Sequence, residues 1–213
     1  APTGSGHLAI AGGEGHSCAI TSTGAVTCWG EDGYGQVSGA PSGTGYTALA
    51  LGADTSCALT STGGVSCWGY DSYGQVSGAP TNTGFVQISA NESINCALDS
   101  LGQVECWGRD YDGSVSSAPS GSGYTHVAGG YHGCAVSSTG YLSCWGYDSY
   151  FAVSYAPTGS GYTSVDNHWH SCALDGSGQL DCWGTYDGNG QISDAPSGTG
   201  YVYITTGETF SCA

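Results

Sequence analysis

The sequence has almost no cationic side chains. Its 213 residues include no lysine and a single arginine, Arg109, against 17 acidic residues, and the formal net charge is −16. Proteins that bind DNA or RNA need Lys and Arg to displace counterions from phosphates, so this composition excludes a nucleic-acid-binding surface. Only 8% of the residues are charged, where about a quarter is usual. The negative charge therefore reflects missing cations and not an excess of carboxylates.

Long apolar runs and helical patterns are also missing. No stretch approaches the 18 or so consecutive apolar residues of a membrane-spanning helix, so we expect a soluble chain. No window shows a convincing apolar period of 3.6 residues, so we expect almost no helix. The sequence has no methionine and no signal peptide, and an exported protein would therefore be represented here in its processed form.

What the sequence does contain is a repeat of about 39 residues, which indicates a repeat architecture. The dipeptide Ala-Pro accounts for all six prolines. The triplet Cys-Trp-Gly recurs five times, and another cysteine stands ten residues before each copy. The chain divides into the repeats 1–39, 40–78, 79–117, 118–155 and 156–194 and a half repeat, 195–213.

Each repeat holds three short apolar segments bounded by Gly, Ser, Thr and Asp, which is typical of strands. In the second repeat they are residues 46–51, 56–60 and 65–68. Pairing the last two places Cys57 opposite Cys67 and leaves both faces of the small sheet apolar, since side chains alternate along a strand. Such sheets must be covered on both sides. We predict an all-β, β-propeller-like array of three-stranded antiparallel blades, five full repeats plus a half repeat.

The same register brings the paired cysteines within reach of a disulfide, because opposed strand residues lie about 4.5–5.5 Å apart at Cα. Reduced core cysteines and metal ligands are the alternatives, although zinc sites usually separate two cysteines by about two to four residues. Disulfides would place the chain in an oxidising compartment, extracellular or at the cell surface. The predicted pairs are Cys18–Cys28, Cys57–Cys67, Cys96–Cys106, Cys134–Cys144 and Cys172–Cys182.

The eleventh cysteine, Cys212, lies in the half repeat and has no partner ten residues later. A half blade exposes a strand edge, and exposed edges pair with other strands. Two expectations follow: the sequence is a piece of a longer array, or another chain completes the blade through self-association. An odd cysteine then remains unpaired as a free thiol or forms an intermolecular bond.

The repeated stretches identify a resemblance. The segments "HSCAI…GAVTCWG…YGQVSG" and "TSCALTSTGGVSCWG…YGQVSG" closely resemble bacterial, exported regulator-of-chromosome-condensation repeats, which form β-propellers. In repeat length the chain is similar to the propeller-type β-lactamase inhibitory protein. Eukaryotic members of the family act as exchange factors on a small GTPase and touch chromatin. Short blades, cysteine hairpins and the lack of cations separate this chain from them, so that activity is not expected here.

The loop after each Cys-Trp-Gly varies most, and every copy contains Asp and Tyr. Repetition places these loops on one rim of the propeller, where Tyr favours binding; merely solvated polar loops are the alternative. The fourth repeat adds an aromatic cluster, which indicates either an interface or local packing. The recurring aspartates are Asp32, Asp71, Asp110, Asp148 and Asp187. The candidate binding residues are Tyr34, Tyr70, Tyr73, Arg109, Tyr111, Tyr147, Tyr150, Phe151, Tyr155 and Tyr186.

Metal and catalytic patterns are weak. "DYDG" and "DGNG" resemble parts of a calcium loop but lack its bidentate Glu, so no cofactor is expected and calcium is the remaining alternative. His16, His132 and His170 share the position two residues before a cysteine, which predicts a structural hydrogen bond. No nucleophile with a base and no distinct carboxylate pair stands out, so we do not expect an enzyme.

These observations predict an extracellular, non-enzymatic recognition module that binds a protein or a glycan through Tyr- and Asp-rich rim loops. The competing expectation is a structural subunit of an extracellular filament or surface assembly. The resemblance adds a narrower one, a protein that inhibits β-lactamase.

Overall fold

The computed structural model describes residues 5–92 and 94–213, and over these residues it contains strands and turns and no helix. Five antiparallel sheets have three strands each, in the order of the sequence, and a sixth has two. The strands are β1 (His7–Gly12), β2 (His16–Thr21), β3 (Val26–Gly30), β4 (Tyr46–Leu51), β5 (Thr55–Thr60), β6 (Val65–Gly69), β7 (Phe85–Ala90), β8 (Ile94–Asp99), β9 (Val104–Gly108), β10 (Tyr124–Ala128), β11 (His132–Ser137), β12 (Leu142–Gly146), β13 (Tyr162–Asn167), β14 (Ser171–Asp175), β15 (Leu180–Trp183), β16 (Thr205–Thr206) and β17 (Ser211–Cys212). The predicted all-β array of three-stranded blades is confirmed.

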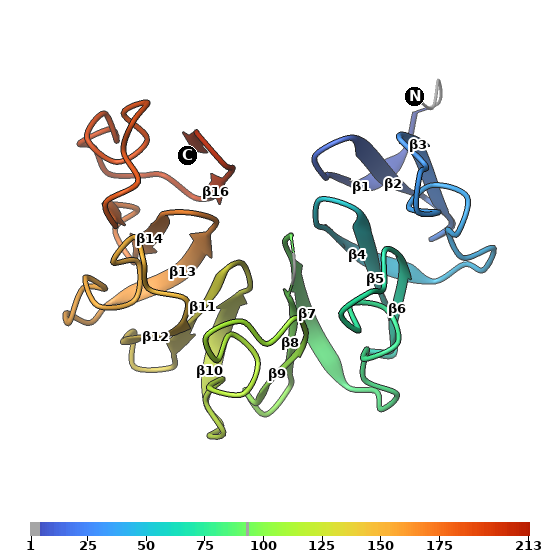
Figure 1. Cartoon of the computed structure of the whole chain (residues 1–213), viewed down its shortest axis with the longest axis horizontal. Helices are drawn as coiled ribbons and strands as arrows, with labels where there is room; N and C mark the ends of the chain where they lie inside the picture. The colour runs from blue at the N-terminus through green and yellow to red at the C-terminus, as the bar shows by residue number, and fades with distance from the viewer. Residues whose placement is uncertain (1–4, 93) are drawn as a thin grey trace.

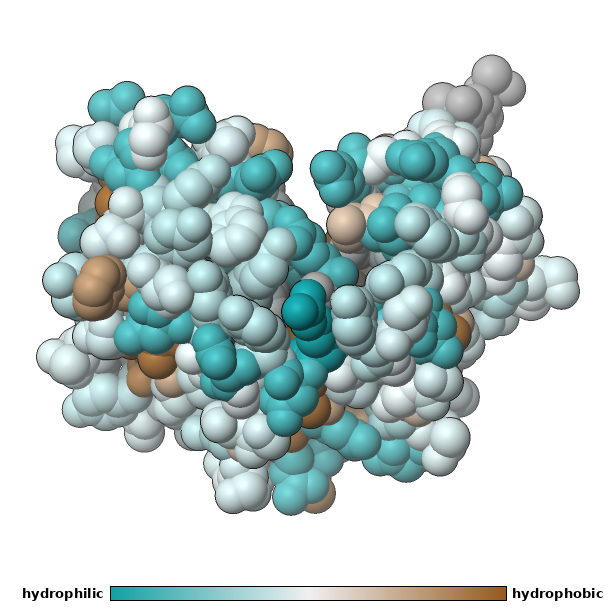
Figure 2. All heavy atoms as spheres, in the orientation of Figure 1, coloured by the Kyte–Doolittle hydropathy of each residue, from teal (hydrophilic) through white to brown (hydrophobic). Residues whose placement is uncertain are grey.

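The blades stand side by side around a central space, and a gap separates the first blade from the last (Figure 1). The first strands of the blades, from β1 to β16, line a central cavity of about 980 Å³. Figure 2 shows the surface notched between the first and last blades. No helix in the described part of the chain is long and apolar enough to cross a membrane.

The predicted strand register is confirmed in detail. Cys57 pairs with Cys67, and Leu59 pairs with Val65. All five predicted disulfides are present, each closing a hairpin between residues ten apart: Cys18–Cys28, Cys57–Cys67, Cys96–Cys106, Cys134–Cys144 and Cys172–Cys182. Cys212 is a free, exposed cysteine at the end of β17.

The two apolar faces of a blade pack against two different neighbours. In the second blade, Trp68 packs with Cys18 and Ile20 of the first blade. Leu59, on the opposite face, packs with Trp107 of the third blade. The apolar core therefore consists of separate clusters, each between two successive blades. This arrangement explains why the sequence places apolar residues on both faces of each strand pair.

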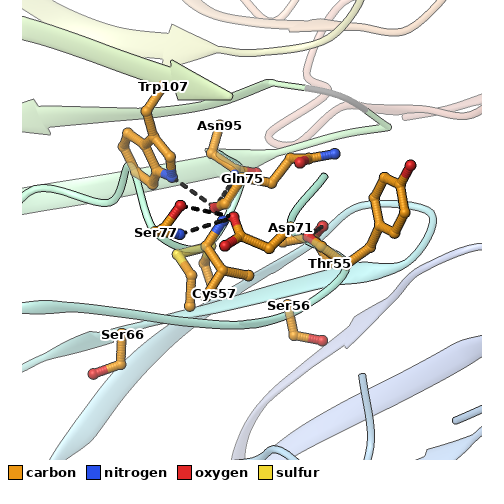
Figure 3. The surroundings of a disulfide bond; sticks show 12 residues. Thr55, Ser56, Cys57, Ser66, Asp71, Gln75, Ser77, Asn95 and Trp107 are labelled. Carbon is orange, nitrogen blue, oxygen red and sulfur yellow. Dashed lines mark hydrogen bonds between the residues drawn. A yellow bond between two sulfur atoms is a disulfide. The ribbon is translucent and has the colours of Figure 1, made fainter. Parts of the chain in front are cut away.

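The tryptophan of each Cys-Trp-Gly triplet also links its blade to the preceding one by a hydrogen bond. Trp107 Nε1 donates to the backbone carbonyl of Gln75 at 2.9 Å, beside the Cys57–Cys67 disulfide (Figure 3). Equivalent bonds join Trp68 to Gln36, Trp145 to Ser114 and Trp183 to Ala152. These four indoles are at most 6% exposed, so each belongs to the core between two blades. Trp29, in the first blade, is half-buried.

Histidines make a second kind of inter-blade bond. His16 Nε2 lies 2.8 Å from Ser56 Oγ, in the next blade. The same contact joins His132 to Ser171 and His170 to Ser211, at 2.6 Å each. The predicted structural role of these three histidines is confirmed.

Candidate functional site

Each rim loop is held in shape by its own aspartate. Asp32 Oδ1 accepts the backbone N–H groups of Val37 and Ser38 at 2.9 Å, and these bonds lower the pKa of the Asp32 carboxyl. Asp71 accepts the corresponding bond from Ser77 (Figure 3). The same pair of bonds recurs at Asp71, Asp110, Asp148 and Asp187. One oxygen of every aspartate in the predicted Tyr/Asp ring therefore serves loop structure.

The rim loops lie at the same end of the molecule as the turns between the first and second strands of the blades. The backbone N–H of Glu31 donates to Gly15, and that of Tyr70 donates to Asp54. Glu31 and Tyr70 begin rim loops, whereas Gly15 and Asp54 belong to the turns. Side chains from two kinds of connection therefore gather on one rim.

Aromatic contacts run along this rim from the first blade. The ring of Tyr34 meets that of Tyr70 at 4.9 Å between centroids, and Tyr70 meets Tyr73 at 6.1 Å. The Arg109 guanidinium lies 4.7 Å from the Tyr73 centroid and 5.1 Å from that of Tyr111. Such cation–π contacts let the single arginine connect the aromatic residues of the second and third blades.

Beyond Arg109 the contacts continue into the fourth and fifth blades. Tyr111 meets Tyr147 at 5.3 Å, and Tyr147 meets Tyr131 at 6.3 Å. Tyr131 stacks on Trp169 at 3.8 Å, and Trp169 also contacts Tyr150 and Tyr186. We call the connected set the aromatic band: Tyr34, Tyr70, Tyr73, Arg109, Tyr111, Tyr131, Tyr147, Tyr150, Trp169 and Tyr186.

The band contains eight of the ten residues that the sequence singled out, and the other two lie apart from it. Phe151 and Tyr155 stack on each other with centroids 4.8 Å apart. Phe151 has φ of 57° at a position where the other complete repeats have glycine. The predicted cluster in the fourth repeat is therefore divided into two groups, because a left-handed turn at Phe151 follows Tyr150.

Two residues of the band, Tyr131 and Trp169, were missed by the sequence reading. Both occupy the turn position that Asp54 holds in the second blade. The signal was available: Trp169 is the one tryptophan of six outside a Cys-Trp-Gly triplet. In the surrounding segment "NHWH", the sequence predicts a role only for His170.

A cavity of about 250 Å³ opens in the middle of the band, where the third, fourth and fifth blades meet. Four of its eight lining residues are aromatic, and Arg109 is the one charged residue among the eight. We call it the band cavity. Its lining residues are Ile94, Arg109, Tyr111, Ser114, Gly130, Tyr131, Tyr147 and Trp169.

The larger central cavity carries a second group of titratable side chains. Burial, together with Glu14 and Glu208, raises the pKa of Glu92 to about 7, and burial lowers the pKa of His168 to about 4. Glu92 Oε1 lies 3.7 Å from His168 Nε2, but both groups are neutral between these two pKa values. The contact is therefore not an ion pair over that range. The described residues contain no group of three or more His, Cys, Asp or Glu placed to hold a metal ion.

Comparison with known proteins places the fold. A family model for the regulator of chromosome condensation (RCC1) repeat matches residues 8–36 and 46–75. No curated protein matches the sequence.

Several solved structures are similar. The ectodomain of the Physcomitrella patens receptor kinase CR4 matches with a TM-score of 0.76 and 26% identity, over 95% of this chain and 56% of that one. The CRINKLY WD40 ectodomain of the Arabidopsis thaliana receptor kinase ACR4 gives 0.65 and 25%, over 84% and 63%. Yeast RCC1 (Prp20), solved with Kap60, gives 0.72 and 18%, over 93% and 63%.

These likenesses show an RCC1-like repeat fold. The chain spans only 56 to 63% of the length of the three solved chains. Two of them are ectodomains of plant receptor kinases.

Proposed function

We propose that the chain is an extracellular, non-enzymatic recognition module that binds a partner through the aromatic band. One observation carries the proposal: aromatic and cation–π contacts connect side chains from all five complete blades into a single surface, from Tyr34 to Tyr186. Tyr and Trp provide large contact areas at a low cost in side-chain entropy, and binding surfaces are rich in both. A surface of this kind needs no cofactor.

The disulfides and the similar structures support the setting. Five hairpin disulfides persist in oxidising compartments, which fits an extracellular location. The similar arrays of blades in CR4 and ACR4 are receptor-kinase ectodomains, which supports the same location for this chain. The bacterial origin and the likeness to a β-lactamase inhibitor remain predictions.

Replacing a central residue of the band tests the proposal. The full chain would be used to select binders from a glycan array and from a displayed-peptide library. We expect Tyr147→Ala to weaken the selected binders about ten-fold or more, because truncation of a central aromatic contact typically has such an effect. The measurement is the dissociation constant of each binder.

A matched control is available in Tyr141, which is 53% exposed in the hairpin turn at the other end of the fourth blade. Tyr141→Ala removes the same kind of side chain and should leave the binders unaffected. Equal losses in both variants, or binders insensitive to Tyr147→Ala, would contradict a role for the band.

A structural subunit is the second candidate, favoured by the outer faces of the end blades. Ile10 is 72% exposed, whereas Ile88, Val127 and Val165 at the same repeat position are buried. Phe210, in the last blade, is 56% exposed. These faces correspond to the ones that pack together inside the chain, so a further blade, such as one from a second copy of the chain, would cover them.

Light scattering at increasing concentration tests this second candidate. Head-to-tail contact between copies predicts that the molar mass of the parent chain rises with concentration. In the Ile10→Asp variant the molar mass should remain that of one chain. A mass of one chain at all concentrations would rule the structural subunit out.

A further inference from the structure

We propose that the band cavity is a pocket for an uncharged aromatic side chain presented by a protein with a basic surface. The proposal rests on the proposed function, since it assigns one part of the aromatic band and the class of partner. It decides between the protein and glycan alternatives in favour of a protein.

The cavity lies where a short side chain replaces a buried glutamine of the repeat. In the first loop, the side chain of Gln36 is fully buried; its Oε1 accepts the Tyr34 N–H, and its Nε2 donates to Asp54. Gln75 and Gln191 occupy the same place and accept the corresponding N–H. The third repeat has Ser114 there and the fourth has Ala152. At Ser114 the shorter side chain leaves space that glutamine fills in the first, second and fifth repeats.

The partner of the missing glutamine has changed as well. Tyr131 stands where the Gln36–Asp54 pair has its aspartate. Its ring stacks on Trp169 at 3.8 Å, and both rings line the cavity. The Gln36–Asp54 pair between the first two blades thus corresponds to Ser114 and the aromatic ring of Tyr131 between the third and fourth blades.

The Ser114 hydroxyl in the cavity is already occupied, which disfavours a sugar there. Ser114 Oγ lies within hydrogen-bond distance of the backbone carbonyls of Tyr111 and Tyr131, and its single O–H donates to one of them. The Arg109 guanidinium is placed over the Tyr73 and Tyr111 rings. A glycan ligand must satisfy many hydroxyl groups, and unpaired polar groups in a buried site are unfavourable.

Size and charge define the occupant further. The volume of about 250 Å³ is below the roughly 300–1,000 Å³ of sites for drug-sized ligands, and it suits one side chain. Aromatic rings attract one another edge to face, and this cavity offers several ring faces. Arg109 beside the cavity disfavours a cationic side chain of the partner in it, because two positive charges would then lie in one desolvated site.

The surroundings of the cavity point to a basic partner surface. The chain carries a net charge of −16, and Asp110 and Asp112, beside Tyr111, are exposed. Complementary charge at the edge of an interface steers association, whereas the apolar centre supplies the anchor. Basic residues flanking an aromatic side chain therefore match what the surface offers.

Short peptides test the proposal with the full chain. The probes are Lys-Lys-Phe-Lys-Lys with blocked ends, the same peptide with Ala in place of Phe, and methyl glucoside. Binding is followed by NMR through the indole N–H signal of Trp169, assigned with Trp169→Phe. We expect the Phe peptide to bind about ten-fold or more tightly than the Ala peptide, and to shift that signal.

The decisive variant restores the polar pair of the first two blades. The double substitution Ser114→Gln with Tyr131→Asp should fill the cavity, preserve the melting temperature to within a few degrees, and weaken the Phe peptide about ten-fold or more. If it fails to fold, Tyr111→Ala serves instead, since Tyr111 is 46% exposed and lines the cavity. Tyr141→Ala is the control that should leave binding unchanged.

Several results would overturn the proposal. They are equal binding of the two peptides, no binding of the Phe peptide, undiminished binding to the double variant, or a Trp169 shift with methyl glucoside alone. Tyr73→Ala separates this proposal from the proposed function, because Tyr73 belongs to the band but does not line the cavity. If Tyr73→Ala weakens peptide binding and the double variant does not, the band binds its partner and the cavity is not the site.

Discussion

Reduction of the five disulfides is expected to lower the melting temperature of the chain by about 25 °C or more. Each bridge closes a hairpin between residues ten apart, for which the chain-entropy relation gives about 2.7 kcal/mol. Five such terms are comparable to the whole stability of a typical domain, about 5–15 kcal/mol. The 39 glycines increase the dependence on the bridges, because glycine loses the most backbone entropy on folding.

Thermal unfolding followed by circular dichroism, with and without excess reductant, measures this effect. The double variant Cys57→Ala with Cys67→Ala should reproduce part of it, and Cys212→Ser should not, since Cys212 is free. An unchanged melting temperature in reductant would show that the disulfides do not contribute to the stability of the blades.

Mildly acidic solution is expected to destabilise the fold through its buried histidines, and His132 is the clearest case. It is 2% exposed, and burial lowers its pKa to about 4, with Asp148 opposing this shift and His168 and His170 adding to it. As the pH falls, His132 in the unfolded chain binds a proton near pH 6.5, whereas His132 in the folded chain stays neutral down to about pH 4. The free energy of unfolding therefore decreases between about pH 6.5 and about pH 4. The expected loss from His132 is about 3 kcal/mol.

Comparison of two variants isolates this contribution from the rest of the molecule. His132→Gln should flatten the dependence of the unfolding free energy on pH by about 3 kcal/mol over this range. His7→Gln, at an exposed position, should retain the dependence of the parent chain. Asp166 and Glu92, whose pKa values burial raises to about 6 and about 7, act in the opposite direction and cancel in the difference. Parallel curves for the parent and His132→Gln would contradict the assignment.

Much of the fold could be predicted because the residues that determine a blade recur in every complete repeat. Cys57 and Cys67 fix the register of a hairpin, and a one-residue slip would move every apolar side chain to the other face. Trp68 is followed by Gly69, whose φ of 105° lets the chain turn into the rim loop. These constraints are local in sequence, so a single repeat is enough to recognise them.

The candidate site was only partly predictable, because its cavity depends on contacts between repeats. The short side chain of Ser114 becomes meaningful only beside Tyr131 of the next blade, which the sequence places 17 residues away. Trp169 was overlooked because it stands between two histidines and outside the repeated triplet. Phe151 was grouped with Tyr150 by proximity in sequence, whereas its backbone conformation separates the two rings.

The contacts between histidine and serine have a consequence for exchanging blades. His16 needs the hydroxyl of Ser56 in the blade that follows it. The third blade has Ile94 at the histidine position, and the fourth has Gly133 at the serine position, where any β-carbon would overlap the Trp145 ring. A copy of the fourth blade inserted after the first would leave His16 facing a residue with no hydroxyl. A blade with a histidine at this position therefore needs a serine in the blade that follows it. Exchange of repeats at the gene level would have to keep the members of each pair in adjacent blades.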